Sequence, residues 1–195
     1  IVAADVIAFT NAVPDLGLNL NNSKCELSAL PSDLSSLNEI QAFNGFQRMP
    51  LSNLLLLGAP LDPFTNTDSV LSKKCEDLNR AISRLSLLQS HDALTLLRNS
   101  LAIPKLLYTL RCADCTGSQE LVKFDTLLKE GLSLILNIDI SQSQWVQASL
   151  PVRDGGLGVR SAVALATSAF LASAAGTNDL QSSILPSRFA NIYDK

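Results

Sequence analysis

The chain has 195 residues, of which 47% are hydrophobic and 17% are charged, and its formal net charge is −3 at pH 7. This composition is that of a globular domain and argues against a mainly disordered chain, while the negative charge argues against strong standalone binding to nucleic acid. Only 5% of the residues are aromatic, so most of a core must be aliphatic, which favours helices over aromatic-rich strands. We therefore expect a mainly α fold.

The first 61 residues predict a helix, a turn and two hairpins. Apolar residues recur at steps of three and four from Val2 to Leu16, and Gly17 is placed to end that helix. Residues 18–20 alternate like a strand, the asparagines that follow favour a turn, and residues 24–27 can return as the second strand. Residues 28–50 resemble a surface loop with a short helix around 34–43, and residues 54–61 predict a strand, a tight turn and a second short strand.

Three antiparallel helices are expected between residues 67 and 136. The first begins at Thr67 or Asp68, Ser90 is placed to cap the second, and the third follows Ser118. Pro104 must kink or restart the second helix because it lacks an amide hydrogen. The expected buried positions are Leu71, Cys75, Leu78, Ile82 and Leu85 in the first helix, Leu94, Leu97 and Leu101 in the second, and Leu121, Phe124, Leu128, Leu132 and Ile135 in the third. Together they predict a helical bundle.

After residue 137 comes a polar stretch, a glycine-rich turn and an Ala-rich helix. The glycines from 155 to 158 match neither dinucleotide-binding nor P-loop spacing, so a structural turn is favoured over a phosphate loop. Ser161 is placed to cap the Ala-rich helix, which should run to about residue 175. This apolar run is shorter than the roughly 20 residues that a membrane span needs. We expect no membrane partner.

We also expect an intracellular protein, nuclear or cytoplasmic, because the first residues carry no basic region or cleavage signature of a secretory signal. In such a compartment the four cysteines would stay reduced. Cys112 and Cys115 have the spacing of a zinc or redox pair, but no second pair of that spacing exists in the sequence. Ordinary thiols at the end of a helix are favoured, and we expect no metal site.

Positive charge is concentrated in the second of the three expected helical segments and its neighbours. Between residues 80 and 111 there are five basic residues and one acidic residue, Asp92. Arg80 and Arg84 are one helical turn apart and so share a face, as contacts along a phosphate backbone require. Such residues can equally form the solvated face of ordinary helices, and both interpretations stay open.

The order of these elements carries a resemblance. The motif Gly-Leu-x-Leu-Asn-x-x-Lys at residues 17–24 resembles the fourth palm motif of reverse transcriptases, and the turn at Leu57 and Gly58 resembles the fifth, the primer-grip hairpin. The basic helices resemble the thumb. Leu150-Pro151 followed by Gly155-Gly156-Leu157 resembles a block downstream of the thumb in retrotransposon reading frames. The chain is thus similar to the C-terminal part of a retrotransposon reverse transcriptase.

This resemblance implies a domain organisation and a set of site residues. Residues 1–62 would be a palm remnant with two hairpins, residues 63–136 a thumb-like helical bundle, and residues 137–195 a helical extension. Lys24 would be catalytic, as the proton donor to departing pyrophosphate. The primer grip would consist of Leu57, Gly58 and Ala59. Sugar and phosphate groups of an RNA–DNA or DNA duplex would be bound, weakly and without sequence preference, by Arg80, Arg84, Arg98, Lys105 and Arg111.

The family's catalytic aspartates are not found in this sequence. In the intact enzymes they bind two Mg²⁺ ions in an upstream palm, within a Tyr-x-Asp-Asp or Phe-x-Asp-Asp box that is missing here. The chain also begins with Ile1 inside an apolar stripe. We therefore expect a fragment without its N-terminal palm and fingers, with no cofactor of its own and no activity alone. The alternative is a helical protein-interaction module, domesticated from such an element or unrelated to one, whose basic face binds an acidic partner.

Overall fold

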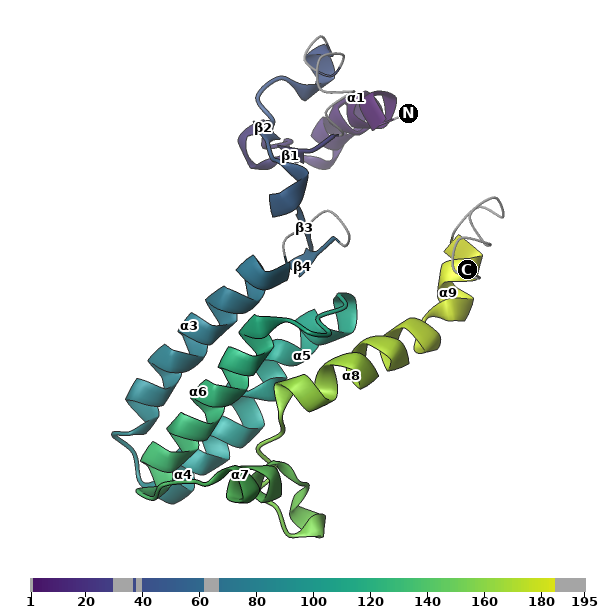
Figure 1. The fold of residues 1–195 in the computed structure, drawn as a ribbon. Coiled ribbons are helices and arrows are strands. Elements are labelled where there is room, and N and C mark those ends of the chain that lie inside the picture. Colours follow the sequence, from purple (N-terminus) through teal and green to yellow (C-terminus); the bar gives the residue numbers. More distant parts are fainter. Residues whose placement is uncertain (1, 30–36, 38–39, 62–66, 185–195) are drawn as a thin grey trace. The chain divides into compact units, whose positions relative to one another are not determined.

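The computed structural model describes residues 2–29, 37, 40–61 and 67–184, and these are mainly helical (Figure 1). The mainly α fold expected from composition is confirmed. The described residues form two compact units, one up to Leu56 and the other from Leu57 onward. Each unit is considered by itself below.

The first unit begins with the predicted helix. Helix α1 (Val2–Ala12) continues into a 3₁₀ turn, η1 (Val13–Leu16), and Gly17 ends it in the left-handed conformation with φ 72°. The Gly17 amide donates to the carbonyl of Pro14 at 2.9 Å. The predicted end of the helix is therefore confirmed. Of the predicted apolar stripe only Val13 is buried, whereas Phe9 and Leu16 are exposed.

The hairpin predicted for residues 18–27 is wrong. Residues 22–24 form a 3₁₀ turn, η2 (Asn22–Lys24), and the strand that follows, β1 (Glu26–Leu27), pairs in parallel with β2 (Gln47–Arg48). The Asn22 side-chain amide donates to the Asn44 carbonyl at 3.0 Å, and the Gln47 amide donates to the Cys25 carbonyl at 2.8 Å. These bonds hold residues 22–25 against residues 44–47, so the polar turn side chains oppose the predicted local pairing.

The rest of the first unit consists of short elements. The predicted helix around 34–43 lies mostly outside the described residues, and its end is a 3₁₀ turn, η3 (Gln41–Phe43). A further 3₁₀ turn, η4 (Leu51–Asn53), precedes β3 (Leu55–Leu56). The predicted strand, tight turn and strand are confirmed, because the chain turns at Leu57 and Gly58 into β4 (Ala59–Pro60). The boundary between the units falls at this turn.

The second unit is a bundle of helices. In chain order it contains α3 (Thr67–Leu85), α4 (Ser90–Leu96), the π-helical turn η5 (Leu97–Leu101), α5 (Ile103–Cys112), α6 (Gln119–Leu136), α7 (Gln142–Ser149), the 3₁₀ turn η6 (Val152–Asp154), α8 (Ala162–Gly176) and α9 (Asn178–Ile184). Helix α3 packs along α6, and α5 packs against α8 (Figure 1). All ten core positions predicted for α3 and α6 are buried. No described helix has the length and apolar character needed to cross a membrane.

The expected second helix is interrupted where Pro104 stands. After η5, Ala102 adopts φ −84° and ψ −117°, and α5 restarts with the proline in its first turn, where a missing amide hydrogen costs no helical hydrogen bond. The predicted restart is therefore confirmed. The predicted cap is wrong, because Gln89 is the N-cap of α4 and Ser90 is already helical. Leu97 is buried, and Leu94 and Leu101 pack partly buried against the core.

Helices α3 and α6 approach each other closely at a glycine. Gly131 of α6 is buried, and a Cβ atom placed there would lie 2.7 Å from Cδ1 and 2.8 Å from Cγ1 of Ile82 on α3. Real atoms do not approach so closely, so the Ile82 side chain occupies the volume that a side chain at 131 would need.

The glycine-rich segment after α7 is a structural turn, as predicted. Gly155 is left-handed with φ 81°, and a Cβ at Gly156 would lie 2.1 Å from the Leu150 carbonyl oxygen. The amides of residues 156, 157 and 158 donate to the carbonyls of Pro151, Ala148 and Leu150. These amides are therefore committed within the protein and do not form a phosphate cradle.

Helix α8 begins at a shared cap. Ser161 is the N-cap, as predicted, and accepts the Ala164 amide at 3.1 Å. Asp125 of α6 also accepts the amide of Ala162 at 2.6 Å, the amide of Val163 at 3.3 Å and the Ser161 hydroxyl. A carboxylate on α6 thus satisfies the free amides at the start of α8.

Candidate nucleic-acid interface

A groove of about 500 Å³ runs between α3 and the segment from α4 to α5 in the second unit. It brings together three of the five cations predicted to bind nucleic acid. Its lining residues are Asp77, Arg80, Ala81, Arg84, Leu85, Leu88, Leu96, Leu101 and Lys105. We call it the cationic groove.

Helix α3 supplies two of these cations. Its opposite face is anchored by the buried side chains described above, which leaves Arg80 and Arg84 one turn apart and exposed. Arg80 forms an ion pair with Asp77, and the side chains of the two residues are 71% and 48% exposed. A pair so exposed contributes little to stability, so Arg80 can exchange it for another anion.

Helix α5 supplies the third cation. Leu106 and Leu110 are fully buried and fix the orientation of α5, which leaves Lys105 exposed. In the part of the chain that the structure describes, neither Lys105 nor Arg84 has a carboxylate within ion-pair distance. Two of the three cations are therefore available to a ligand.

The remainder of the cationic groove is aliphatic. Leu88 and Leu96 are 48% and 42% exposed, whereas Leu85 is buried and Leu101 half-buried. A floor of this kind accommodates the sugar faces of a nucleic acid or the apolar side of a helix. The arrangement binds by charge and shape, and it offers no nucleophile or acid–base pair.

The other two predicted cations lie elsewhere. Arg98 belongs to η5 and lines a different groove, and Arg111 is exposed in the last turn of α5 without lining either groove. The structure therefore groups Arg80, Arg84 and Lys105, and it does not group Arg98 and Arg111 with them.

The residues predicted to form the primer grip lie in a tight turn. Leu57 has φ 52° and is 88% exposed, Gly58 has φ 81°, and no atom lies within 4 Å of a Cβ placed on Gly58. Ala59 is 9% exposed and presents little side chain to a ligand. The open backbone at Gly58 is the part of this turn that another chain can approach closely.

Tyr108 holds this turn against α5. The Tyr108 hydroxyl donates to the Leu57 carbonyl at 3.0 Å. On α5, Tyr108 lies one helical turn after Lys105. Sequence reasoning missed Tyr108, because the two bonded residues are 51 positions apart and no local pattern signals such a bond.

Lys24, predicted to be catalytic, lies in the first unit. It is the last residue of η2 and is exposed. No described acidic residue pairs with it at ion-pair distance. Its catalytic role stays a prediction.

Of the two cysteines at the end of α5, one is exposed to solvent and the other is in the core. Cys112 is exposed, whereas Cys115 is buried, and burial raises the pKa of Cys115 to about 11. Such a thiol is protonated at neutral pH and is a poor metal ligand or nucleophile. Among the described residues, no group of three or more His, Cys, Asp or Glu side chains could hold a metal ion.

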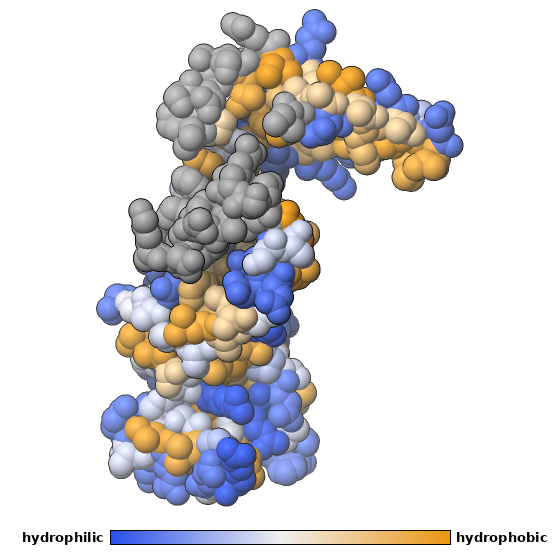
Figure 2. Space-filling view, turned by 90° about the vertical axis from the view of Figure 1, so that its right-hand side faces the viewer, coloured by the Kyte–Doolittle hydropathy of each residue, from blue (hydrophilic) through white to orange (hydrophobic). Residues whose placement is uncertain are grey.

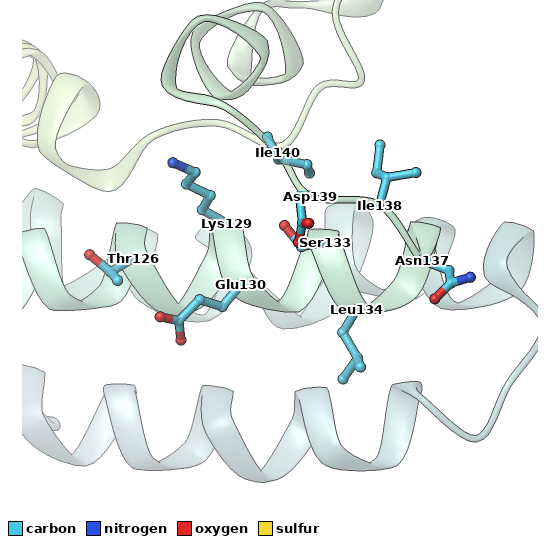
Figure 3. Close-up of a pocket in the computed structure, with 9 residues that line it drawn as sticks. All are labelled: Thr126, Lys129, Glu130, Ser133, Leu134, Asn137, Ile138, Asp139 and Ile140. Carbon is cyan, nitrogen blue, oxygen red and sulfur yellow. The ribbon is translucent and has the colours of Figure 1, made fainter.

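Another hollow, of about 690 Å³, lies along the second half of α6 and the loop after it (Figure 3). Lys129 and Glu130 extend toward different sides of α6 in Figure 3, and Leu134 lies on the side of Glu130. One lysine is accompanied here by two carboxylates, Glu130 and Asp139. Because its charges are mixed and its charged side chains do not point toward a common centre, this hollow is a weaker candidate for a nucleic-acid site than the cationic groove.

Comparisons with protein-family models, with curated proteins and with solved structures gave no match. The function is therefore argued from the residues of this chain.

Proposed function

We propose that this chain is a fragment of a reverse transcriptase, an RNA-directed DNA polymerase, carrying the primer-grip and thumb regions that hold a primer–template duplex. The observation that carries the proposal is the cationic groove, which gathers Arg80, Arg84 and Lys105 from two helices. The order of the sequence motifs supports the same assignment.

The groove would act on the duplex through its phosphates. Each cation that neutralises a phosphate releases condensed counterions, so binding weakens steeply with salt. Contacts to phosphate and sugar carry no sequence information, so an RNA–DNA hybrid and a DNA duplex of any sequence would be bound. The net charge of −3 opposes binding at long range and keeps the affinity low.

The other predicted residues would assist this role. The open backbone at Gly58 would lie close to the primer, held in place through the bond from Tyr108 to Leu57. Lys24 would donate a proton to pyrophosphate only where a palm supplies the aspartates and Mg²⁺. By itself, the chain would bind a duplex without polymerising.

The test is the salt dependence of binding to a 20-base-pair RNA–DNA hybrid, followed by fluorescence anisotropy. For B-form DNA the logarithm of affinity falls with the logarithm of salt by about 0.9 per neutralised phosphate. We expect Arg80→Ala with Arg84→Ala to flatten the slope by about two units while far-UV circular dichroism stays unchanged.

The matched control is Arg153→Ala. Arg153 is an arginine with an 86% exposed side chain that lies outside the cationic groove, so its replacement should leave the slope nearly unchanged. An equal slope in the parent chain and the Arg80/Arg84 double variant would assign those arginines to an ordinary solvated face.

The second candidate function is a helical protein-interaction module, domesticated from a retroelement or unrelated to one. It is favoured by the exposed leucines that share the groove with the cations, Leu88 and Leu96. An amphipathic acidic helix would satisfy both kinds of side chain. Under this function, replacing both leucines by Asn would abolish partner binding without changing the salt slope measured with the hybrid.

A further inference from the structure

A second groove, of about 620 Å³, lies where the junction of η5 and α5 meets the loop between α7 and α8. Its lining residues are Arg98, Asn99, Ala102, Ile103, Pro104, Leu107, Pro151, Val152, Gly158, Val159 and Arg160. None of them lines the cationic groove. We call it the arginine groove.

The charge of this groove is entirely positive. Arg98 and Arg160 are its charged residues, and no Asp or Glu is among the lining residues. Within the described ranges, neither arginine forms an ion pair. Two guanidinium groups without a carboxylate form a surface that favours an anionic group.

Arg98 is held in place before any ligand arrives. Its Nε donates to Oδ1 of Asn99 at 3.1 Å. Its aliphatic stem lies over Gly158, because a Cβ atom at that glycine would be 3.0 Å from Cδ and 3.8 Å from Cγ of Arg98. Gly158 has φ 73°, so glycine both adopts this backbone and leaves room for the stem. In the described part of the chain, no side chain or carbonyl accepts a hydrogen bond from the terminal nitrogens of Arg98.

The walls of the groove are apolar. Ala102, Ile103 and Val159 are buried and form its floor, whereas Val152 is 60% exposed. Leu107 is partly buried against the core. A ligand that fills this groove must therefore bring an apolar group as well as an anion. A free phosphate or another small inorganic anion brings only the charge, whereas a peptide with an acidic and an apolar side chain brings both groups.

We propose that the arginine groove binds a short peptide segment of a protein partner, with a carboxylate on Arg98 and Arg160 and an aliphatic or aromatic side chain against Val152 and Leu107. The proposal does not depend on duplex binding, because the two grooves share no lining residue.

The probe is a panel of fluorescein-labelled nonapeptides with a central Glu and with Leu, Ile, Val or Phe at neighbouring positions. Binding to the full chain is measured by fluorescence anisotropy. We expect members of the panel to bind, and their counterparts with Gln in place of Glu to bind about tenfold more weakly, because a charge-assisted hydrogen bond is lost.

Three variants locate the binding site. Arg98→Gln and Arg160→Gln should each weaken the peptide by about tenfold. Gly158→Ala should weaken it as well, because a Cβ at that position displaces the stem of Arg98. Arg153→Gln is the control, since Arg153 lies in the same loop outside the groove and should not change the affinity. Circular dichroism of each variant confirms that the helices remain.

Failure of this proposal is distinguishable from failure of duplex binding. Absence of binding by every Glu peptide, or equal binding to the Arg98 and Arg160 variants, would overturn the peptide site. An RNA–DNA hybrid whose affinity falls in those variants while the peptides do not bind would make the groove a nucleic-acid surface instead. Substitutions of Arg80 and Arg84 should leave peptide affinity unchanged.

Discussion

Helices α1 and α3 show that apolar content and burial are separate properties. Most residues of α1 are apolar, yet none of them is buried. Helix α3 carries more polar than apolar residues, and its five apolar stripe positions are all buried against the rest of the second unit. Burial follows from apolar residues gathered on one face that meets a partner element, and α3 has such a partner in α6.

The same contrast holds for the two units as wholes. The buried apolar side chains of the helices in the second unit form one cluster that joins α3 to α8. In the described part of the first unit, the buried hydrophobic residues are Val13 and Phe43. On the face drawn in Figure 2, hydrophobic residues are interspersed with hydrophilic ones. We therefore expect the second unit to supply most of the measurable stability of the chain, and three experiments test this expectation.

The largest effect is expected from the centre of the second unit. Leu128 is 0% exposed, so Leu128→Ala should lower the free energy of unfolding by about 2–5 kcal/mol, through lost burial and a cavity. The matched change in the first unit is Ile7→Ala, at a position that is 52% exposed, where less than about 0.5 kcal/mol is expected. Urea unfolding followed by circular dichroism measures both. Similar losses at the two positions would contradict the contrast between the units.

A smaller effect is expected from the cap that joins α6 to α8. Asp125→Ala removes the acceptor of the Ala162 and Val163 amides and of the Ser161 hydroxyl, so about 1–3 kcal/mol should be lost. The control is Asp5→Ala, which removes a carboxylate from α1 in the first unit. An unchanged urea midpoint in the Asp125 variant would show that α8 docks by packing alone.

The smallest effect on stability near neutral pH is expected from the two buried thiols. Burial raises the pKa of Cys75 and of Cys115 to about 11, from the ordinary value of 9.0. Because the folded chain holds these protons more tightly than the unfolded chain, both thiols contribute fully to stability below pH 9. That contribution is lost as the pH rises from about 9 through 11.

Alkylation with iodoacetamide at pH 8 tests how strongly each unit protects its cysteine thiols from solvent. The exposed Cys112 and the half-buried Cys25 of the first unit should be modified first, and Cys75 and Cys115 only as the second unit opens. Peptide mass spectrometry reads out each site. Equal rates at Cys25 and Cys75 would show that the two units protect their thiols equally.

The sequence predicted the parts of the fold that depend on local periodicity. Four features follow from spacing or from the conformational limits of single residues: the stripes of α3 and α6, the helix restart at Pro104, the turn at Leu57 and Gly58, and the Ser161 cap. The parallel pairing of β1 with β2 was not predictable in this way. It depends on hydrogen bonds that join residues more than 20 positions apart.

For the candidate sites, too, the local features were predictable from the sequence and the contacts between distant residues were not. Arg80 and Arg84 were predicted to share a face because they are one turn apart on one helix. Their meeting with Lys105 depends on how α3 packs against η5, the turn that precedes α5, and no local pattern specifies this packing. The same is true of Arg160, which sequence reasoning did not single out, and of its meeting with Arg98 across more than 60 residues.

The contact between Gly131 and Ile82 links the inside of the bundle to the side that carries the cationic groove. Ile82 lies on α3 between Arg80 and Arg84, and its inward reach is set by the hydrogen that Gly131 carries in place of a methyl group. A methyl group at 131 would have to displace the Ile82 side chain or α3 itself, the helix that carries both arginines. If the proposed duplex binding holds, Gly131→Ala should therefore alter the affinity for the duplex although every residue that lines the cationic groove stays the same.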